Sequence, residues 1–487
     1  SLYSHNPSAS SLKGAGNLSF KKVSRISRPS PVISRNSSVN NKLYIKERTH
    51  KVANIELSTQ PYKGTRDFYP REMTLRNWFF GKIRERLRLC CFEEYGGPML
   101  ESLDIYIAKS GEELAGEQTY NFEDRGGRRL AVRPEMTPTV ARMVAGKLGE
   151  LSFPLRWFSI PNLYRYERPQ RGRLREHWQV NVDIFGADGF EADAEVIATA
   201  VSLLDALGAK KDMYRVHINN RRFFNDVICS LCGTDAEGAK KISKVIDRKG
   251  KVGREAYEKD MLALGVNAEM LAKLDSVYSM SVTEAAALCP DSQGAAELLG
   301  LFSLLERLGL AEVCEFDFGI IRGLDYYTGT VFEVFDTSPE NNRAMFGGGR
   351  YDNLVGLFVK NAHVSGVGFG FGDVTLENFL VTHDLIPADL YTGTAKVLVT
   401  RFEGIDYEDY ASLAAKIREA GVACTVYNGQ QRKIGKEFDY AGKAGFTHAV
   451  TMGGDEKAAG VVKVKNLSRR EEKTVPIADL ADPKIFD

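Results

Sequence analysis

The sequence predicts an α+β protein: a main domain with an antiparallel sheet, helices and a helical insertion, followed by a small α/β domain. Three patterns predict this fold: strands paired through short turns, a long stretch dominated by Ala, Leu, Lys and Glu, and strands alternating with helices near the C-terminal end. The expected parts are a disordered basic extension (1–57), the main domain (58–385, insertion at about 230–313), a linker (386–394) and the α/β domain (395–487).

The main domain begins with a helix predicted over 71–94, where apolar residues recur at helical spacing until Gly96-Gly97 stops it. The following segments are, in order, a hairpin at 120–138, a helix at 191–207, helices throughout 221–313 and a strand within 316–335. In the last domain, strands "AKVLVT", "ACTVYN" and "THAVTMGG" alternate with helices at 407–420 and 431–443. That βαβαβ order predicts a small parallel sheet, followed by a strand "GVVKVKN".

Charge is distributed unevenly along the chain. Residues 1–51 contain ten Lys or Arg and one Glu, so they carry +9; because the net charge is +1, the rest carries −8. A polyanionic partner would therefore be bound by local basic patches. No apolar run approaches the roughly 18 residues of a membrane span, so no membrane partner is expected.

Residues 1–51 are rich in Ser, Asn and Arg and poor in apolar side chains, so we expect them to be disordered. The same composition is typical of an organelle transit peptide, although Pro29 and Pro31 interrupt any amphipathic helix. We expect a cytoplasmic protein, with mitochondrial or dual targeting left open. Seven cysteines form no disulfide framework; Cys229 and Cys232 have metal-ligand spacing, but no second pair follows, which favours core thiols.

The most informative stretch is "YRYERPQRGRLREHWQVNVDIFG" (164–186), which places five arginines in the turn between predicted strands "PLRWFSIPNLY" and "HWQVNVDIF". Arginine forks match phosphate oxygens, and the glycine lets backbone approach a ligand. Alternation along the second strand gives it one polar face: His177, Gln179, Asn181 and Asp183. An exposed sheet face would show the same alternation. The arginine turn instead favours a polyphosphate at the tip and a small polar molecule along that face.

Two glycine-rich segments, "GGGRYD" and "GVGFGFG", are weak signals alone. Neither contains G-x-G-x-x-G, so a dinucleotide-binding fold is not expected. Together, however, "GTRDFYP", "RPEMTP", "YRYERPQRGRLREHWQ", "RGLDYYTGTVFEVF", "GGGRYD" and "GVGFGFG" occur in the order found in histidyl-tRNA synthetases, which are class II aminoacyl-tRNA synthetases. The chain resembles that family from residue 62 to about 372, and its last domain resembles the family's anticodon-binding domain.

The resemblance implies that the partners are ATP, L-histidine and tRNA-His, with Mg²⁺ bound to ATP and no protein-only metal site. It implies that Arg165 binds the α-phosphate of ATP, Glu167 faces the adenine and Arg173 reaches the terminal phosphates. Arg322, in "RGLDYY", would lie between the histidine carboxylate and the α-phosphate, so Arg322 and Arg165 are the implied catalytic residues.

The resemblance also implies a histidine site. Glu135, Thr137 and Gln179 would bind the α-amino group, and Asp183 and Tyr327 the two imidazole nitrogens, with Tyr326 beside them. Arg322 completes the implied set. Buried polar partners of this kind reject analogues that lack the matching groups, so no editing domain is expected. The helix at 71–94 and the strand after it resemble class II motif 1, which implies a homodimer.

One departure from the family pattern concerns class II motif 3. A gapless match places Thr375 where the family has an arginine, and no arginine occurs between 351 and 400. Arg343 and Arg350 are the nearest candidates to replace it. Two alternatives to a ligase stay open: a non-catalytic paralogue that acts as a regulatory subunit, and a nucleic-acid-binding accessory factor on the same fold.

Overall fold

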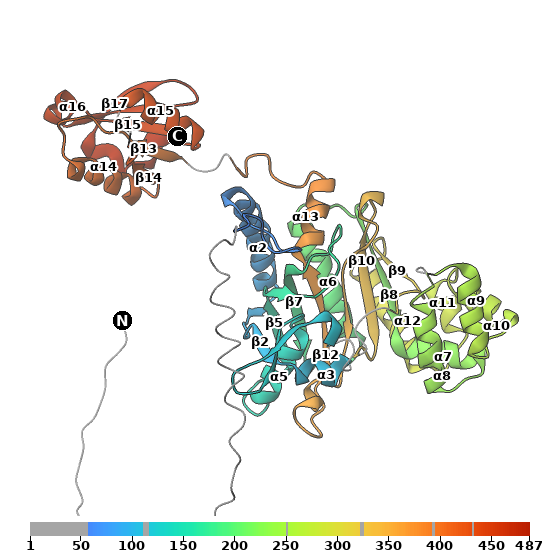
Figure 1. Cartoon of the computed structure of the whole chain (residues 1–487). Coiled ribbons are helices and arrows are strands. Elements are labelled where there is room, and N and C mark those ends of the chain that lie inside the picture. Colours follow the sequence, from blue (N-terminus) through green and yellow to red (C-terminus); the bar gives the residue numbers. More distant parts are fainter. Residues whose placement is uncertain (1–56, 111–115, 250–251, 322–325, 392–394, 431–432) are drawn as a thin grey trace, which may run out of the picture. The chain divides into compact units, whose positions relative to one another are not determined.

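The computed structural model describes residues 57–110, 116–249, 252–321, 326–391, 395–430 and 433–487 (Figure 1). The basic extension expected at 1–57 lies outside these ranges except for its last residue. No helix within them is long and apolar enough to cross a membrane.

The main domain is built on a nine-stranded sheet whose six central strands pair antiparallel, which confirms the expected α+β fold. The central strands, in spatial order, are β5 (Leu155–Ser159), β7 (Glu176–Phe185), β12 (Gly366–Gly372), β11 (Ala344–Arg350), β10 (Thr330–Asp336) and β8 (Tyr214–Asn220). Short parallel strands flank them, β1 (Glu93–Glu94) beside β5 and β9 (Cys314–Phe316) beside β8. The segment predicted as one strand, "PLRWFSIPNLY", divides at Pro161 into β5 and β6 (Asn162–Tyr164), and both pair with β7.

Helix α2 (Pro70–Leu89) packs against α6 (Phe190–Ala206), and their apolar faces share one core with the central strands. The helix predicted to reach residue 94 ends at Leu89. There Cys91 turns left-handed (φ 59°) and the N–H of Phe92 donates to the carbonyl of Leu87 at 3.0 Å. This Schellman-type ending satisfies a carbonyl of the last turn and directs the chain into β1.

The remaining elements of the main domain lie around the sheet. They are a three-stranded sheet of β2 (Leu100–Ser102), β4 (Arg129–Val132) and β3 (Tyr120–Glu123), and the helices α3 (Asp104–Ser110), α5 (Thr137–Gly146) and α13 (Asp373–Thr382). Asp373 begins α13 directly after the glycine-rich strand β12.

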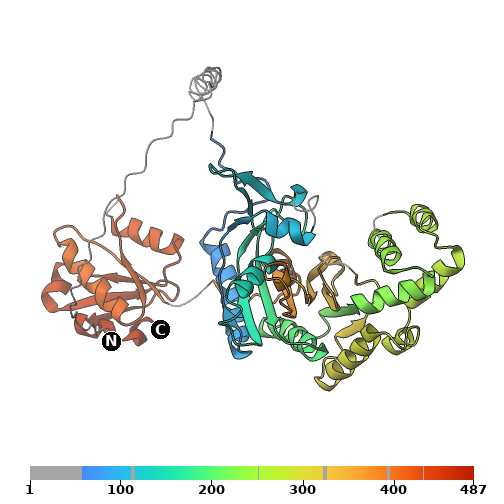
Figure 2. The same ribbon diagram turned by 90° about the horizontal axis from the view of Figure 1, so that it is seen from below.

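Between β8 and β9 the chain forms a cluster of helices, drawn in green to yellow in Figures 1 and 2. They are α7 (Arg221–Cys232), α8 (Ala236–Ile246), α9 (Arg254–Ala263), α10 (Ala268–Val277), α11 (Val282–Ala286) and α12 (Gln293–Arg307). The side chain of Asn220 accepts from the N–H groups of Arg222 and Phe223, which turns the end of β8 directly into α7.

The last domain has its own core and a five-stranded sheet, β14-β13-β15-β16-β17. Its elements are β13 (Lys396–Val399), α14 (Tyr407–Glu419), β14 (Ala423–Val426), α15 (Ile434–Lys443), β15 (His448–Thr451), α16 (Gly454–Ala459), β16 (Val461–Asn466) and β17 (Glu472–Pro476). The expected parallel sheet is mixed, because β16 and β17 run antiparallel. The connection through α16 is shorter than the dozen or more residues of a parallel crossover, so the chain must reverse.

Candidate active site

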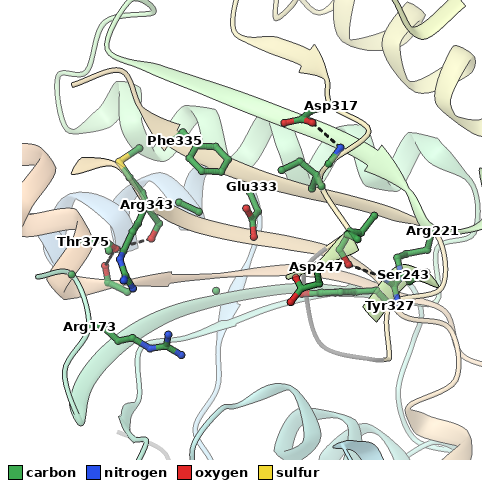
Figure 3. A pocket seen from close by; sticks show the side chains of 18 of the residues that line it. Arg173, Arg221, Ser243, Asp247, Asp317, Tyr327, Glu333, Phe335, Arg343 and Thr375 are labelled. Atoms are coloured by element: carbon green, nitrogen blue, oxygen red, sulfur yellow. Dashed lines mark hydrogen bonds between the residues drawn. The ribbon is translucent and has the colours of Figure 1, made fainter. Parts of the chain in front are cut away.

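A cavity of about 1740 Å³ lies along one face of the central strands (Figure 3). Its walls come from the arginine hairpin, strands β7, β10 and β12, helices α7 and α8, and the segment before β11. Of the residues predicted from the sequence, those on the wall are Arg165, Glu167, Arg173, Gln179 and Tyr327. The structure therefore brings the hairpin and the polar face of β7 into one space.

The polar face of β7 is not exposed as in an ordinary amphipathic strand: His177 and Gln179 are half-buried, and the next two residues on this face are buried. Asn181 and Asp183 are 4% and 2% exposed. The glycines of the neighbouring strand β12 make room for this face. A Cβ on Gly370 would lie 1.8 Å from Nε2 of Gln179, and one on Gly368 would lie 2.3 Å from Oδ1 of Asp183. "GVGFGFG" is thus a strand without side chains on the face that these polar groups cross.

Gln179 and Asp183 keep unused hydrogen-bonding capacity inside the protein. Oε1 of Gln179 and Oδ2 of Asp183 are buried and accept no hydrogen bond from the residues that the structure describes. Native proteins seldom leave buried acceptors unsatisfied, so such atoms indicate a site for a polar ligand. The other carboxyl oxygen of Asp183 accepts from the hydroxyl of Tyr351. Burial raises the pKa of Asp183 to about 7, and the bond from Tyr351 opposes that rise.

The two tyrosines of "RGLDYY" lie at the same end of the cavity. The rings of Tyr326 and Tyr327 are 4.8 Å apart. Burial, followed by Tyr327 and Glu135, raises the pKa of Tyr326, whereas a hydrogen bond with Thr137 lowers it. Burial raises the pKa of Tyr327, with smaller contributions from Glu135 and Asp183. Glu135, Thr137 and Asp183 are therefore neighbours of the two tyrosines.

Two arginines of the hairpin, Arg165 and Arg173, lie on the cavity wall, and Figure 3 shows Arg173 at the end away from Tyr327. Nε of Arg165 donates to the carbonyl of Pro134 at 2.9 Å. Arg173 and Glu167, predicted to contact different parts of ATP, form a two-bond ion pair with each other. The hydrogen bond that Arg173 donates to Glu167 raises the pKa of Arg173. A phosphate that contacts Arg173 must therefore compete with Glu167.

His177 also lies on the cavity wall. Burial and, after it, the positive charges of Arg165, Arg66 and Arg173 lower the pKa of His177 to about 3. The imidazole is therefore neutral at physiological pH.

The sequence also pointed to Arg322, Thr375 and Arg350. Arg322 lies outside the described residues. Thr375 is on the wall, and its hydroxyl donates to the carbonyl of Met345 at 2.6 Å. Arg350 is 4% exposed and is paired with Asp193 at 2.6 Å, which rules out the expectation that it replaces the motif 3 arginine.

Sequence reasoning missed Tyr351 and Glu333. Tyr351 stands in "GGGRYD", and nothing in that motif indicates a bond to a strand residue far away in the sequence. Glu333 lies on the cavity wall in β10. A single acid inside the apolar run "TVFEVF" is the signal that could have identified it.

An antiparallel sheet with an arginine-tipped hairpin beside its cavity, followed by a separate α/β domain, is the architecture of a class II aminoacyl-tRNA synthetase. The family model described as histidyl-tRNA synthetase matches residues 64–373, and the model described as anticodon binding domain matches residues 396–483. The chain belongs to the histidyl-tRNA synthetase family.

Individual proteins agree with this assignment. The chain is 42% identical over 426 residues to a histidine–tRNA ligase of Leptospira biflexa, covering 87% of this chain and 97% of that protein. The crystal structure of histidyl-tRNA synthetase from Nostoc sp. PCC 7120 matches with a TM-score of 0.71 and 25% identity, covering 88% of this chain and 98% of that one. A structure from Bacillus halodurans, described as an ATP phosphoribosyltransferase regulatory subunit/histidyl-tRNA synthetase, matches with a TM-score of 0.66 over 82% of this chain and 99% of that one. Its 22% identity shows the fold alone.

Proposed function

We propose that the chain is a histidine–tRNA ligase, which forms histidyl-adenylate and pyrophosphate from L-histidine and ATP and then transfers histidine to tRNA-His. The observation that carries this proposal is the pair of buried, unsatisfied oxygens, Oε1 of Gln179 and Oδ2 of Asp183, on the sheet that also borders the arginine-lined cavity. One space thus offers hydrogen-bonding groups for a small polar molecule and cations for a polyphosphate.

In this proposal Glu135, Thr137 and Gln179 bind the α-amino group of histidine, while Asp183 and Tyr327 accept and donate at the imidazole nitrogens. Tyr326 packs beside them. Fixing both ring nitrogens orients the substrate, so its carboxylate faces the α-phosphate.

Arg165 and Arg322 stabilise the charge that develops when the carboxylate attacks the α-phosphate and pyrophosphate leaves. Glu167 faces the adenine and Arg173 the terminal phosphates, once their mutual ion pair opens. Mg²⁺ bound to ATP would offset the charge of the phosphates during this attack. No group of three or more His, Cys, Asp and Glu suited to a metal ion occurs among the residues described.

The regulatory alternative is less well supported. A subunit that only regulates another enzyme needs neither an anticodon-binding domain nor an intact histidine site. Here residues 396–483 match that domain, and the described histidine-site residues cluster. A nucleic-acid-binding accessory factor would likewise not need that cluster.

We further propose a homodimer, because the segment that resembles motif 1 is followed by apolar side chains that are exposed in the single chain: Met99 before the three-stranded sheet, and Leu100 and Phe122 within it. Sedimentation at micromolar concentration tests this, and a fully active monomer would contradict it. The proposed location is the cytoplasm. A reporter fused to residues 1–57 would reveal mitochondrial or dual targeting.

The ligase proposal is tested by histidine-dependent exchange of pyrophosphate into ATP, followed by charging of tRNA-His. We expect both activities with the full chain and Mg²⁺. Folded protein that exchanges no pyrophosphate in the presence of histidine would support the regulatory alternative, and exchange without charging would support adenylate formation alone.

A further inference from the structure

The arginines at the phosphate end of the cavity differ in whether a carboxylate already pairs with them. Arg173 is paired with Glu167, and Thr375 on the same wall carries no charge. Arg343, in contrast, has one hydrogen-bond partner among the described residues, the neutral Oε1 of Gln170 at 2.9 Å. A neutral amide is a weaker competitor for a guanidinium than a carboxylate. Arg343 is therefore transferred to a bound anion more readily than Arg173.

Several contacts place Arg343 next to the residues of this corner. Gln170 forms a two-way backbone pair with Arg173, each bond 2.9 Å long, so the partner of Arg343 adjoins the arginine predicted to reach the terminal phosphates. Thr375 donates to the carbonyl of Met345, two residues after Arg343. Figure 3 shows Arg343 beside Thr375 on the cavity wall, with Arg173 also at this end.

We propose that Arg343 is an ATP-binding residue that contacts the terminal phosphates from the segment before β11, together with Arg173. This inference rests on the proposed ligase function. The planar guanidinium can bind two phosphate oxygens at once, and its exposed position lets it reach them without opening a buried ion pair. The phosphates would thus be bound by two segments far apart in the sequence, the hairpin and the loop that leads into β11.

The hairpin also offers a matched control. Arg171 reaches the same loop, where its guanidinium lies 3.2 Å from Oδ1 of Asn341 and 3.5 Å from a carboxylate oxygen of Glu340. Arg171 and Arg343 therefore both tie the hairpin to this loop, but Arg343 lies on the cavity wall and Arg171 pairs with a carboxylate. Loss of Arg171 removes a loop contact and a positive charge without removing the proposed phosphate contact.

The experiment is histidine-dependent pyrophosphate exchange by the full chain, with KM for ATP and for histidine measured separately. Arg343→Ala should raise KM for ATP at least about tenfold, the change that a loss of about 1.4 kcal/mol produces, and leave KM for histidine within about twofold. Arg171→Ala should leave both constants within about twofold. Adding Thr375→Arg to Arg343→Ala should recover part of the ATP affinity.

Competition by AMP identifies which part of the nucleotide is contacted. Inhibition by AMP should be the same in wild type and Arg343→Ala, because AMP lacks the terminal phosphates. Equal weakening of AMP and ATP would overturn the assignment to those phosphates. An unchanged KM for ATP in Arg343→Ala, or an equal rise with Arg171→Ala, would overturn the inference while wild-type exchange still upholds the ligase. Absence of wild-type exchange would overturn the proposed function itself.

Discussion

The carboxyl of Asp183 lies in surroundings that hold its pKa far from that of an ordinary aspartate. Burial raises that pKa to about 7, and the hydroxyl of Tyr351 stabilises the ionised form. Above this pH the carboxylate accepts from an imidazole N–H, and below it the group is protonated. Histidine binding should therefore strengthen as pH rises through about 7, because the raised pKa delays ionisation until then.

Tyr351→Phe tests this account. The substitution removes a hydrogen bond to the charged form of Asp183, so the pKa of Asp183 must rise further. In the pH profile of kcat/KM for histidine, the inflection near 7 should move to higher pH, and KM for histidine at pH 7 should increase. Activity should return above the new inflection.

Free histidine titrates in the same range, with an imidazole pKa of about 6.5, so a control is needed. Asp183→Asn should retain only the inflection of the substrate. If Tyr351→Phe and wild type have the same profile, the tyrosine does not influence this carboxyl and serves packing alone.

At the scale of elements, strands β12 and β7 together form the polar wall of the site. Asp183 lies opposite Gly368 in the antiparallel register, and Gln179 lies opposite Gly372. The side chains of β7 can cross β12 because β12 presents glycines there. The glycines of β12 therefore shape the site by leaving space for the polar side chains of β7.

Gly370→Ala tests whether the side chain of Gln179 needs the space that this glycine leaves. The added methyl group would lie 1.8 Å from Nε2 of Gln179, the end of a flexible side chain, so Gln179 must rotate while the backbone stays in place. We expect KM for histidine to rise about fivefold to tenfold, as loss of a ligand hydrogen bond of roughly 1 to 1.4 kcal/mol implies, with little change in melting temperature.

Two other glycines provide contrasts. Gly372→Ala meets nothing nearer than Oγ1 of Thr375 at 3.8 Å and should resemble wild type. Gly348→Ala would bring a methyl group within 2.1 Å of the carbonyl of Gly368, so it should lower the melting temperature. An unchanged KM for histidine in Gly370→Ala would show that Gln179 does not bind that substrate.

At the scale of the whole molecule, the last domain has cores made from its own residues. Its two apolar clusters draw their members from residues 395–486. Each domain can therefore fold without the apolar surface of the other. Adenylate formation and tRNA recognition should be separable in the chain.

A chain that ends at residue 391 should retain histidine-dependent pyrophosphate exchange, because the cavity is formed before that position. Charging of tRNA-His should fall by about 100-fold, since two linked binding surfaces commonly gain 10²–10⁴ in affinity over one. Exchange and charging are measured on the same preparations. A parallel fall in both would show that the last domain supports the active site.

Local patterns were sufficient to predict most elements, whereas the site residues were predicted from the family resemblance. The 3.6-residue and two-residue periodicities of α2, α6 and β7 follow from near neighbours in the chain, so they are visible in the sequence. The end of α2 was not visible in the sequence, because the left-handed conformation of Cys91 depends on how the chain enters β1. The reversal of β16 was missed because direction depends on the length of the connection through α16.

The sequence by itself determined the family, the arginine hairpin and the polar residues of β7, because each is recognised from short stretches of the chain. Only the tertiary structure decided that Arg350 pairs with Asp193, that Tyr351 bonds Asp183, and that Arg343 lies on the cavity wall. Each of these contacts joins residues more than 150 positions apart or depends on packing around the cavity. Their partners are selected by the fold, and no local pattern records that selection.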